Sequence, residues 1–447
     1  MTNIRQYQTE DIPDFTIEKL GSGEVESPLK EFALSYVEDS ARIVYDPRLI
    51  SIKRHIEKNE DPPSMEVAGP RQKLFFNPSD VRAAIVTCGG LCPGLNDVIR
   101  SIFMELHYRY HVKEVLGIRY GYSGLVPRVG QPPMTLTPDL VTNIHRQGGT
   151  LLGSSRGPQD CVEIVDFLER TRINVLFTIG GDGTQRGALG IANEIERRNL
   201  NIGIIGIPKT IDNDISFVEQ SFGFNTAVAI AKDVLSSAHE EARGAFNGVA
   251  VVKLMGRHSG FIAAMAAVAT GDANFVMVPE VPCGMEGEQG FLKVLERRLE
   301  SRGHALVVVA EGAGQKLLEG SNSEKHYDAS GNVKLDDIGV YLRDRIAAHF
   351  CSGWHAATVK YIDPSYIIRS SPANAEDSIF CSRLGRNAVH AAMSGRTKMI
   401  VGIWNNTFTH VPMSAVISKR KQIDPAGPQW LTVLESTGQP ANMSGVV

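Results

Sequence analysis

VLFTIGGDGTQRGALGIANEI, residues 175–195, is the stretch of the sequence that decides the fold. Its first five residues, VLFTI, are apolar apart from one threonine and rich in branched side chains, as in a buried strand, and the glycines after them suit a tight turn. Beyond the turn, apolar residues recur with the spacing of one helix face, at Leu189, Ile191, Ala192 and Ile195. The stretch therefore predicts a strand, a turn and an amphipathic helix, which is the unit that builds parallel sheets.

The same alternation recurs along most of the chain. Short apolar runs that end in polar turns lie at 81–87, 201–207, 248–254, 274–280, 305–310 and 399–404. A chain of 447 residues exceeds one ordinary core, which predicts two domains, or three. We expect an α/β fold with doubly wound, mostly parallel sheets. Residues 1–78 lack sustained periodicity and are predicted to form an N-terminal extension that wraps the body or a partner subunit.

The composition argues against several classes of protein. A formal net charge of −4 leaves no broad cationic face, so we expect neither a nucleic-acid binder nor a membrane-surface binder. The six cysteines form no paired set with the spacing of zinc ligands, and no apolar run reaches the roughly 18 residues that span a bilayer. The first residues lack the form of a signal peptide. We therefore expect a cytoplasmic protein with reduced thiols.

Five polar motifs follow five of the predicted strands. In chain order they are CGGLCPGLND (88–97), GGDGTQRGA (180–188), PKTIDND (208–214), MGRHSG (255–260) and EGAGQ (311–315). Ligands of open α/β sheets bind at the carboxyl ends of the strands. The sequence therefore predicts that all five motifs meet in one crevice.

Two of these motifs are rich in glycine and indicate phosphate binding. Gly89 and Gly90 precede a predicted helix, whose N-terminus attracts phosphate, although tight turns also use glycine for steric reasons alone. In GGDGT, Gly180 and Gly181 clear space for a polyphosphate, and Asp182 can hold Mg²⁺ directly or through water. The alternative is a glycine-rich turn whose aspartate caps the next helix.

The PKTIDND motif carries two carboxylates two residues apart, Asp212 and Asp214, which an extended stretch places on one side. A positioned carboxylate can accept the proton of an attacking hydroxyl, and Lys209 and Thr210 can contact the transferring oxygens. The alternative is that Asn213 and Asp214 only form an Asx turn. The motif is the sharpest indication of catalysis in the sequence.

Further charged and aromatic residues are candidates for binding the substrates. Arg257, after Met255 and Gly256, stands at a strand end, where a guanidinium can bridge a phosphoryl group in transfer. Glu311 could receive sugar hydroxyls, and Arg156 could link two phosphate groups. In KYIDPSYIIRSSP a basic and aromatic cluster suits a terminal phosphate, and its members are Lys360, Tyr366 and Arg369. Each of these residues alone could equally be an ordinary surface side chain.

Taken together, the motifs resemble the phosphofructokinase family, whose members phosphorylate fructose 6-phosphate at its 1-hydroxyl. The resemblance runs from about Val81 to about Trp404, with CGGLCPGLNDVIR, GGDGTQRGAL, PKTIDND, VKLMGR, AEGAGQ and KYIDPSY in family order. It is strongest to the long ATP-dependent forms of plants and kinetoplastid protists.

The resemblance implies roles for individual residues. Asp212 would be the catalytic base, assisted by Thr210, Asp214, Lys209 and Arg257, and Asp182 would be the magnesium carboxylate. The nucleotide would be bound by Gly90, Tyr122, Arg156, Gly157, Gly181, Asp182, Gly183 and Thr184. Fructose 6-phosphate would be bound by Thr210, Ile211, Asp212, Met255, Gly256, Arg257, Glu311, Lys360, Tyr366 and Arg369.

It also implies an architecture with chain crossovers. A nucleotide-binding domain would comprise 79–224 with 369–420, and a sugar-phosphate-binding domain would comprise 225–368 with 421–447. The resemblance further implies a homotetramer.

The phosphoryl donor depends on two residues. Lys209 stands where the pyrophosphate-using branch of the family also carries lysine, so pyrophosphate is an alternative donor. Gly183 matches the ATP-using branch, because a larger acidic side chain there would fill the space of the α-phosphate and repel it. We expect Mg-ATP as the donor. A NAD or lipid kinase, which shares GGDG, and a catalytically silent regulatory subunit are weaker alternatives.

Overall fold

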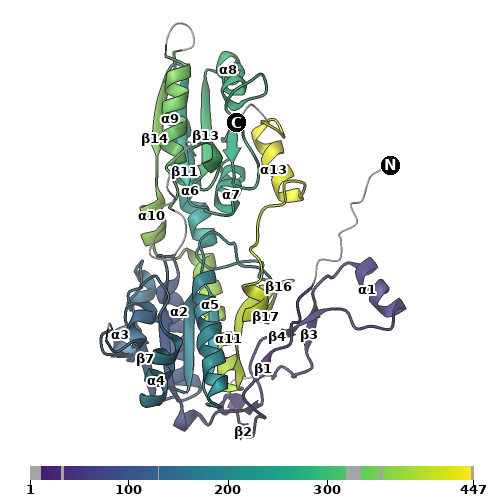
Figure 1. The fold of residues 1–447 in the computed structure, drawn as a ribbon, viewed down its shortest axis with the longest axis vertical. Coiled ribbons are helices and arrows are strands. Elements are labelled where there is room, and N and C mark those ends of the chain that lie inside the picture. The colour runs from purple at the N-terminus through teal and green to yellow at the C-terminus, as the bar shows by residue number, and fades with distance from the viewer. Residues whose placement is uncertain (1–11, 32–34, 129, 319–333, 352–355, 444–447) are drawn as a thin grey trace.

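The structure is a computed structural model that describes residues 12–31, 35–128, 130–318, 334–351 and 356–443. Parts of the predicted N-terminal extension and of the predicted sugar-phosphate-binding domain therefore lie outside the described residues. The described part of the chain contains two large sheets that lie one above the other along the long axis of the molecule (Figure 1).

The larger sheet has nine strands. Their order is β3 (Arg42–Val44), β4 (Ser64–Val67), β17 (Thr407–Pro412), β16 (Met399–Trp404), β10 (Gly203–Pro208), β9 (Val175–Gly180), β6 (Arg82–Thr87), β7 (Glu114–Ile118) and β8 (Met134–Thr135). The five strands from β16 to β7 are parallel, and the strands outside them pair antiparallel.

Helices cover both faces of this sheet. Along β6, Ala83 and Ile85 face one core and Ala84 and Val86 face the other, as the alternation of a strand requires. The first core includes α2 (Leu95–Met104) and α11 (Ala375–Met393), and the second includes α4 (Cys161–Arg170) and α5 (Asp182–Arg197). The sheet is thus doubly wound.

The smaller sheet has four parallel strands in the order β12 (Phe275–Met277), β13 (His304–Ala310), β11 (Gly248–Leu254) and β14 (Thr358–Ile362). Its two faces are covered by α6 (Phe224–Arg243) and α7 (Phe261–Thr270), and by α8 (Phe291–Arg302) and α9 (Ile338–His349). The predicted α/β class with doubly wound, mostly parallel sheets is confirmed.

The chain passes between the two sheets more than once. After β14 and α10 (Ser365–Ser370), α11 returns to the larger sheet. After β17 and α12 (Met413–Val416), the chain crosses to the smaller sheet, where α13 (Pro428–Thr437) packs on α7 (Figure 1). Such crossovers accord with the predicted architecture, and the domain boundaries stay a prediction.

The N-terminal segment adds two strands to the larger sheet and takes part in two separate two-stranded sheets. β3 and β4 extend one edge, β1 (Glu18–Lys19) pairs with β15 (Arg396–Thr397), and β2 (Val25–Glu26) pairs with β5 (Lys73–Leu74). α1 (Leu49–Glu57) has no buried residue and projects from the body (Figure 1). The remaining short elements are α3 (Pro138–Val141), a π-helical turn at Glu105–Arg109, and 3-10 turns at Pro28–Glu31, Pro78–Asp80, Gly121–Leu125, Ile144–Arg146 and Gln315–Leu317.

Candidate active site

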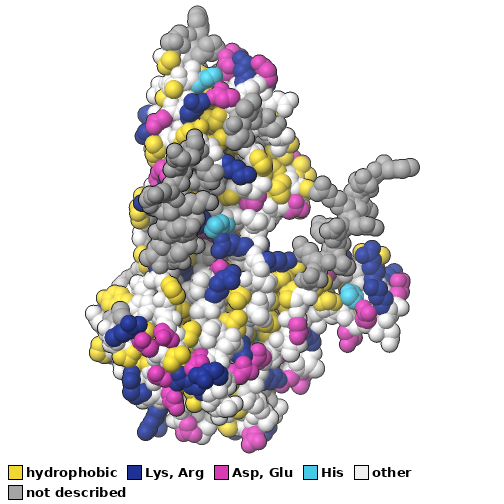
Figure 2. Space-filling model, in the orientation of Figure 1, with side chains coloured by type: hydrophobic (Ala, Val, Ile, Leu, Met, Phe, Trp, Pro, Cys, Tyr) yellow, Lys and Arg dark blue, Asp and Glu magenta, His cyan; other side chains and the backbone are white. Residues whose placement is uncertain are grey.

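A cavity of about 700 Å³ lies between the two sheets, at the carboxyl ends of β6, β9, β10, β11 and β13. All five polar motifs contribute to its lining, so the predicted convergence is observed. On the face that Figure 2 shows, lysine and arginine side chains gather along this boundary, near the segment between β17 and α13.

Most of the predicted site residues line this cavity. They are Gly90, Tyr122, Arg156, Gly157, Gly181, Asp182, Gly183, Thr184, Lys209, Thr210, Ile211, Asp212, Asp214, Arg257, Glu311 and Arg369. Met255, Gly256, Lys360 and Tyr366 are not part of its lining.

Three cations surround the backbone at Gly90. A Cβ atom there would lie 2.9 Å from Nη1 of Arg369 and 3.3 Å from Nη2 of Arg156, and Nζ of Lys209 donates to the Gly90 carbonyl at 2.7 Å. Burial lowers the pKa of Lys209, and the neighbouring guanidiniums of Arg369 and Arg156 lower it further. Cations held this close together repel one another, so the loop is an attractive site for a polyphosphate.

The turn after β10 places two carboxylates on the cavity. Asn213 adopts a left-handed φ of 54°, and its side chain accepts the Ser221 N–H and donates to the Glu219 carbonyl. Thr210 Oγ1 donates to Asp214 at 2.8 Å and accepts the Asp212 N–H. The side chain of Asn213 thus bonds residues 219 and 221, and that of Asp214 accepts from Thr210, so these hydrogen bonds differ from those of an Asx turn, which run to the backbone two residues on.

The environment of Asp212 changes its acidity. Among the described residues no hydrogen-bond partner reaches its buried Oδ1. Burial raises the pKa of Asp212 to about 7, and the nearby carboxylates of Asp214 and Glu311 add to the shift. A carboxylate with a pKa near neutrality suits proton transfer at physiological pH.

The GGDGT motif uses its glycines for different reasons. A Cβ at Gly180 would lie 2.1 Å from Oγ1 of Thr184, so packing alone requires glycine there. A Cβ at Gly183 would meet nothing within 4 Å. Packing does not explain Gly183, which leaves open space beside Asp182 in the cavity.

Asp182 begins α5 and does not cap it, since the N-cap Gly181 has no side-chain cap bond. Its Oδ2 instead accepts hydrogen bonds from Arg186 Nε at 3.2 Å and Arg420 Nη2 at 3.3 Å. No group of three histidine, cysteine or acidic residues in the described part of the chain could hold a metal by itself. A single carboxylate fits Mg²⁺, which proteins often bind through one or two carboxylates together with phosphates and water.

The MGRHSG loop stands beside this carboxylate turn. Gly256 has a φ of 131°, and a Cβ there would lie 2.4 Å from the Ser259 carbonyl oxygen, so the loop requires glycine. Met255 is fully buried, and its Sδ accepts a hydrogen bond from Arg369 Nε at 3.3 Å. Met255 and Gly256 thus support Arg369 and Arg257 from outside the cavity wall.

Lys360 and Tyr366 lie elsewhere in this structure. Lys360, on β14, forms an ion pair with Glu241 of α6, and Tyr366, on α10, is 85% exposed. Their predicted role in binding the sugar phosphate stays a prediction, and the geometry of the cavity does not support it.

Sequence reasoning missed several residues that line the cavity, namely Ser155, Gln159, Cys161, Arg186, His258 and Arg420. Arg186 and His258 lie inside quoted motifs, and Ser155 directly precedes Arg156, so proximity could have indicated all three. Arg420 had no such signal, because it lies in a run of basic residues, SKRK, that reads as a solvated surface.

Comparison with known proteins identifies the family. The sequence profile of phosphofructokinase matches residues 82–392. This chain belongs to the phosphofructokinase family. The matched region contains every predicted site residue, from Gly90 to Arg369.

Individual relatives of this phosphofructokinase cover nearly the whole chain. An ATP-dependent 6-phosphofructokinase of Borreliella burgdorferi is 50% identical over 96% of this chain and 98% of its own. One from Amycolatopsis methanolica is 47% identical over 97% of both chains. The solved structure of a pyrophosphate-dependent phosphofructokinase from Marinobacter aquaeolei is 20% identical, with a TM-score of 0.66 over 80% of this chain and 91% of that one. At this identity the likeness shows the fold alone.

Proposed function

We propose that this phosphofructokinase is an ATP-dependent 6-phosphofructokinase that transfers a phosphoryl group from Mg-ATP to the 1-hydroxyl of fructose 6-phosphate. The observation that carries the proposal is Asp212, whose pKa is raised to about 7 in a cavity that also holds a cluster of cations. A base and an anion site side by side are what this transfer needs.

Asp212 would accept the proton of the sugar 1-hydroxyl. The oxygen of that hydroxyl would attack the γ-phosphorus of ATP, and ADP would leave. Thr210 and Asp214 hold the turn that presents Asp212. Arg156, Arg257 and Lys209 would stabilise the charge on the transferring group. These interactions act in the transition state, where they raise the rate.

The remaining residues divide between the two substrates. Mg²⁺, when bound with ATP, would neutralise charge on the phosphates, and Asp182 would supply its protein carboxylate. Tyr122, whose hydroxyl donates to the Thr184 carbonyl at 2.7 Å, fixes the first turn of α5 at the nucleotide side. Glu311, Arg257 and Arg369 would bind fructose 6-phosphate.

ATP is the proposed donor because Gly183 leaves room next to the polyphosphate site. The full-length relatives named as ATP-dependent support the same donor. Lys209 does not separate the two donors, since a point charge serves any polyphosphate.

The test is a coupled assay of purified protein with fructose 6-phosphate and either Mg-ATP or Mg-pyrophosphate. We expect turnover with ATP and no appreciable turnover with pyrophosphate. Gly183→Asp should impair ATP use severely without unfolding the protein, because the added side chain enters open space in the free enzyme. Gly183→Ala, which adds no charge and little volume, is the matched control. Turnover with pyrophosphate and none with ATP would show that Lys209 is the better guide to the donor.

We also propose a homotetramer in the cytoplasm. Three apolar side chains of α1, Leu49, Ile50 and Ile56, are 59–66% exposed, as expected of a surface that another subunit covers. In the described residues no helix is long and apolar enough to cross a membrane. Light scattering after gel filtration would test the tetramer, and a monomer at micromolar concentration would refute it.

A further inference from the structure

The segment 417–423, ISKRKQI, belongs to the link between α12, beside the larger sheet, and α13, beside the smaller sheet (Figure 1). The Lys421 N–H donates to the Asp214 carbonyl at 3.0 Å, and the Gln422 side chain donates to the His258 carbonyl at 2.9 Å. Ser216 Oγ donates to the Lys419 carbonyl at 3.0 Å. The linking segment is therefore fastened to the catalytic turn and to the MGRHSG loop at once.

Arg420 is the residue of this segment that lines the cavity. Its backbone forms an antiparallel bridge with Ile215, which directly follows Asp214. Its side chain is 33% exposed and lies between two carboxylates, with Nη2 3.3 Å from Asp182 Oδ2 and Nε 3.9 Å from Asp214 Oδ2. One guanidinium thus ties the GGDGT motif to the PKTIDND motif.

The hydrogen bonds to Asp182 distinguish its two oxygens. Arg420 and Arg186 both donate to Oδ2, and within the described ranges no donor is hydrogen-bonded to Oδ1. Groups that hydrogen-bond a metal-binding carboxylate orient it, and their loss typically weakens metal binding about 10- to 100-fold. Arg420 also offsets the repulsion between Asp182 and Asp214, which face the same cavity.

We propose that Arg420 is a positioning residue for the metal–nucleotide complex, an inference that rests on the proposed function. It holds Asp182 by Oδ2 and ties it to the catalytic turn, so that Oδ1 is presented to the Mg²⁺ that accompanies the nucleotide. Arg420 acts through Asp182 and not by contact with the phosphates.

This distinction has a direct test in nucleotide binding without turnover. Isothermal titration of ADP into the protein, with Mg²⁺ and with EDTA, separates binding through the metal from binding of the bare phosphates. For Arg420→Gln we expect ADP affinity to fall about 10-fold with Mg²⁺ and to stay unchanged with EDTA. Arg420→Lys keeps the charge but not the fork of donors, so its affinity with Mg²⁺ should lie between those of Arg420→Gln and the wild type.

Lys419→Gln is the matched control, since it removes one positive charge from the neighbouring residue, which is exposed and outside the cavity lining. It should bind ADP like the wild type under both conditions. If Arg420→Gln does not fold, the titrations of Arg420→Lys decide the question. The expected result is then a loss of ADP affinity in the presence of Mg²⁺ and no loss in the presence of EDTA.

Two results would overturn the inference. Equal losses of affinity with Mg²⁺ and with EDTA would place Arg420 on the phosphates or in a structural role, and no loss under either condition would give it no role in binding. A wild-type protein that does not bind Mg-ADP would instead refute the proposed function. The two failures are therefore distinguishable.

Discussion

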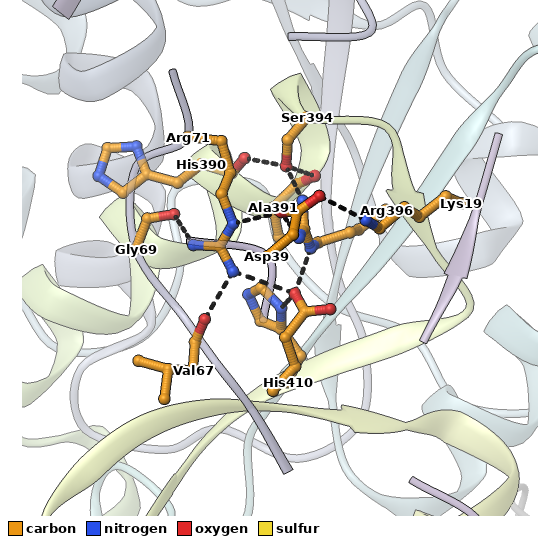
Figure 3. Close-up of polar contacts among 11 residues, drawn as sticks. Lys19, Asp39, Val67, Gly69, Arg71, His390, Ala391, Ser394, Arg396 and His410 are labelled. Carbon is orange, nitrogen blue, oxygen red and sulfur yellow. Dashed lines mark hydrogen bonds and ion pairs between the residues drawn. The ribbon is translucent and has the colours of Figure 1, made fainter. Parts of the chain in front are cut away.

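Two regions of this protein bury charged side chains, and they do so in opposite ways. The first is a network that fastens the N-terminal segment to the larger sheet, which we call the arm network (Figure 3). It consists of Lys19, Asp39, Glu66, Arg71, Arg396 and His410. The second region is the active-site cavity.

In the arm network every described charge has an opposite charge as its partner. Arg396, which is 1% exposed, pairs with Glu66 and with Asp39, and Arg71 pairs with the same two carboxylates. His410 Nδ1 lies 2.8 Å from Glu66 Oε1, and because a carboxylate only accepts, the neutral ring carries its proton on Nδ1. Each buried charge of this network is therefore compensated within the chain, and removal of one partner would leave a buried charge with less compensation.

In the cavity like charges are gathered instead. Asp212 lies near Asp214 and Glu311, and Lys209 lies near Arg156 and Arg369. The Lys209 ammonium donates to the carbonyl of Gly90 and not to a carboxylate. The arm network therefore compensates its charges within the chain. In the cavity Arg420 pairs with Asp182 and Asp214, but Asp212 and Lys209 form no ion pair with the described residues and remain available to ligands. Mutations should therefore affect stability in the first region and catalysis in the second.

The largest effect should come from the cavity. Asp212→Asn removes the proposed base but keeps its shape, so kcat should fall about 10²- to 10⁴-fold. Fructose 6-phosphate affinity should change little, and the melting temperature should not fall, because a buried like charge is lost. Steady-state kinetics and thermal unfolding measure both. Near-normal turnover of the purified variant would show that Asp212 is not the catalytic base.

The matching change in the arm network is Arg396→Met. Loss of one partner leaves Glu66 buried with less compensation, which should lower the free energy of unfolding by about 3–5 kcal/mol. Below the melting temperature kcat should stay near that of the wild type. Lys19→Met, at a pair with one exposed partner, is the control and should cost about 1 kcal/mol or less. If Arg396→Met lost activity but not stability, the arm network would contribute to catalysis, contrary to the expectation that it acts on stability alone.

Arg369→Ala tests the substrate side of the cavity. A charged hydrogen bond made in both ground and transition states should be lost, raising the KM for fructose 6-phosphate about 10- to 100-fold with a smaller change in kcat. Arg369 also lies close to Gly90 and Arg156. If the KM for ATP changed and that for the sugar did not, Arg369 would belong to the nucleotide side.

The last prediction concerns the pH dependence of the stability of the arm network. Burial lowers the pKa of His410 to about 4, below its ordinary 6.5, so between these values the unfolded chain binds a proton that the folded chain does not. The contribution of His410 to the free energy of unfolding is fully present above pH 6.5. It is lost as the pH falls towards 4, by up to about 1.4 kcal/mol per pH unit. Denaturant unfolding at pH 7, 5.5 and 4.5 measures it. His410→Gln, which can still donate to Glu66, should show a shallower slope, and an equal slope would assign the effect to other groups.

Apolar runs predicted six strands well, namely β6, β9, β10, β11, β13 and β16, because strands buried on both faces are apolar throughout. β12 ends at Met277, short of the predicted 280, since Pro279 cannot donate to a ladder. β14 and β17 were not predicted because both contain polar residues, which are partly exposed in the edge strand β14 and buried in β17, where Thr409 and His410 lie inside the sheet. β7 was not predicted because its apolar run is short and begins after the polar residues Lys113 and Glu114.

The cavity was predictable for a similar reason. Motifs at strand ends must meet when the strands are parallel, and each residue of such a motif is positioned by the strand next to it. Arg420 and the arm network were beyond prediction, since Arg420 meets Asp182 from 238 residues away and Arg396 meets Glu66 from 330 residues away.

By itself the sequence determined the α/β class, the positions of most of the buried parallel strands, and the five motifs that meet around Asp212. Those features follow from local periodicity and from the rule that parallel strands share one carboxyl edge. Only the tertiary structure decided which buried charges are paired and which are left for ligands. That division depends on contacts between residues distant in sequence, and Coulomb energy depends on distance in space and on burial, neither of which the order of residues reveals.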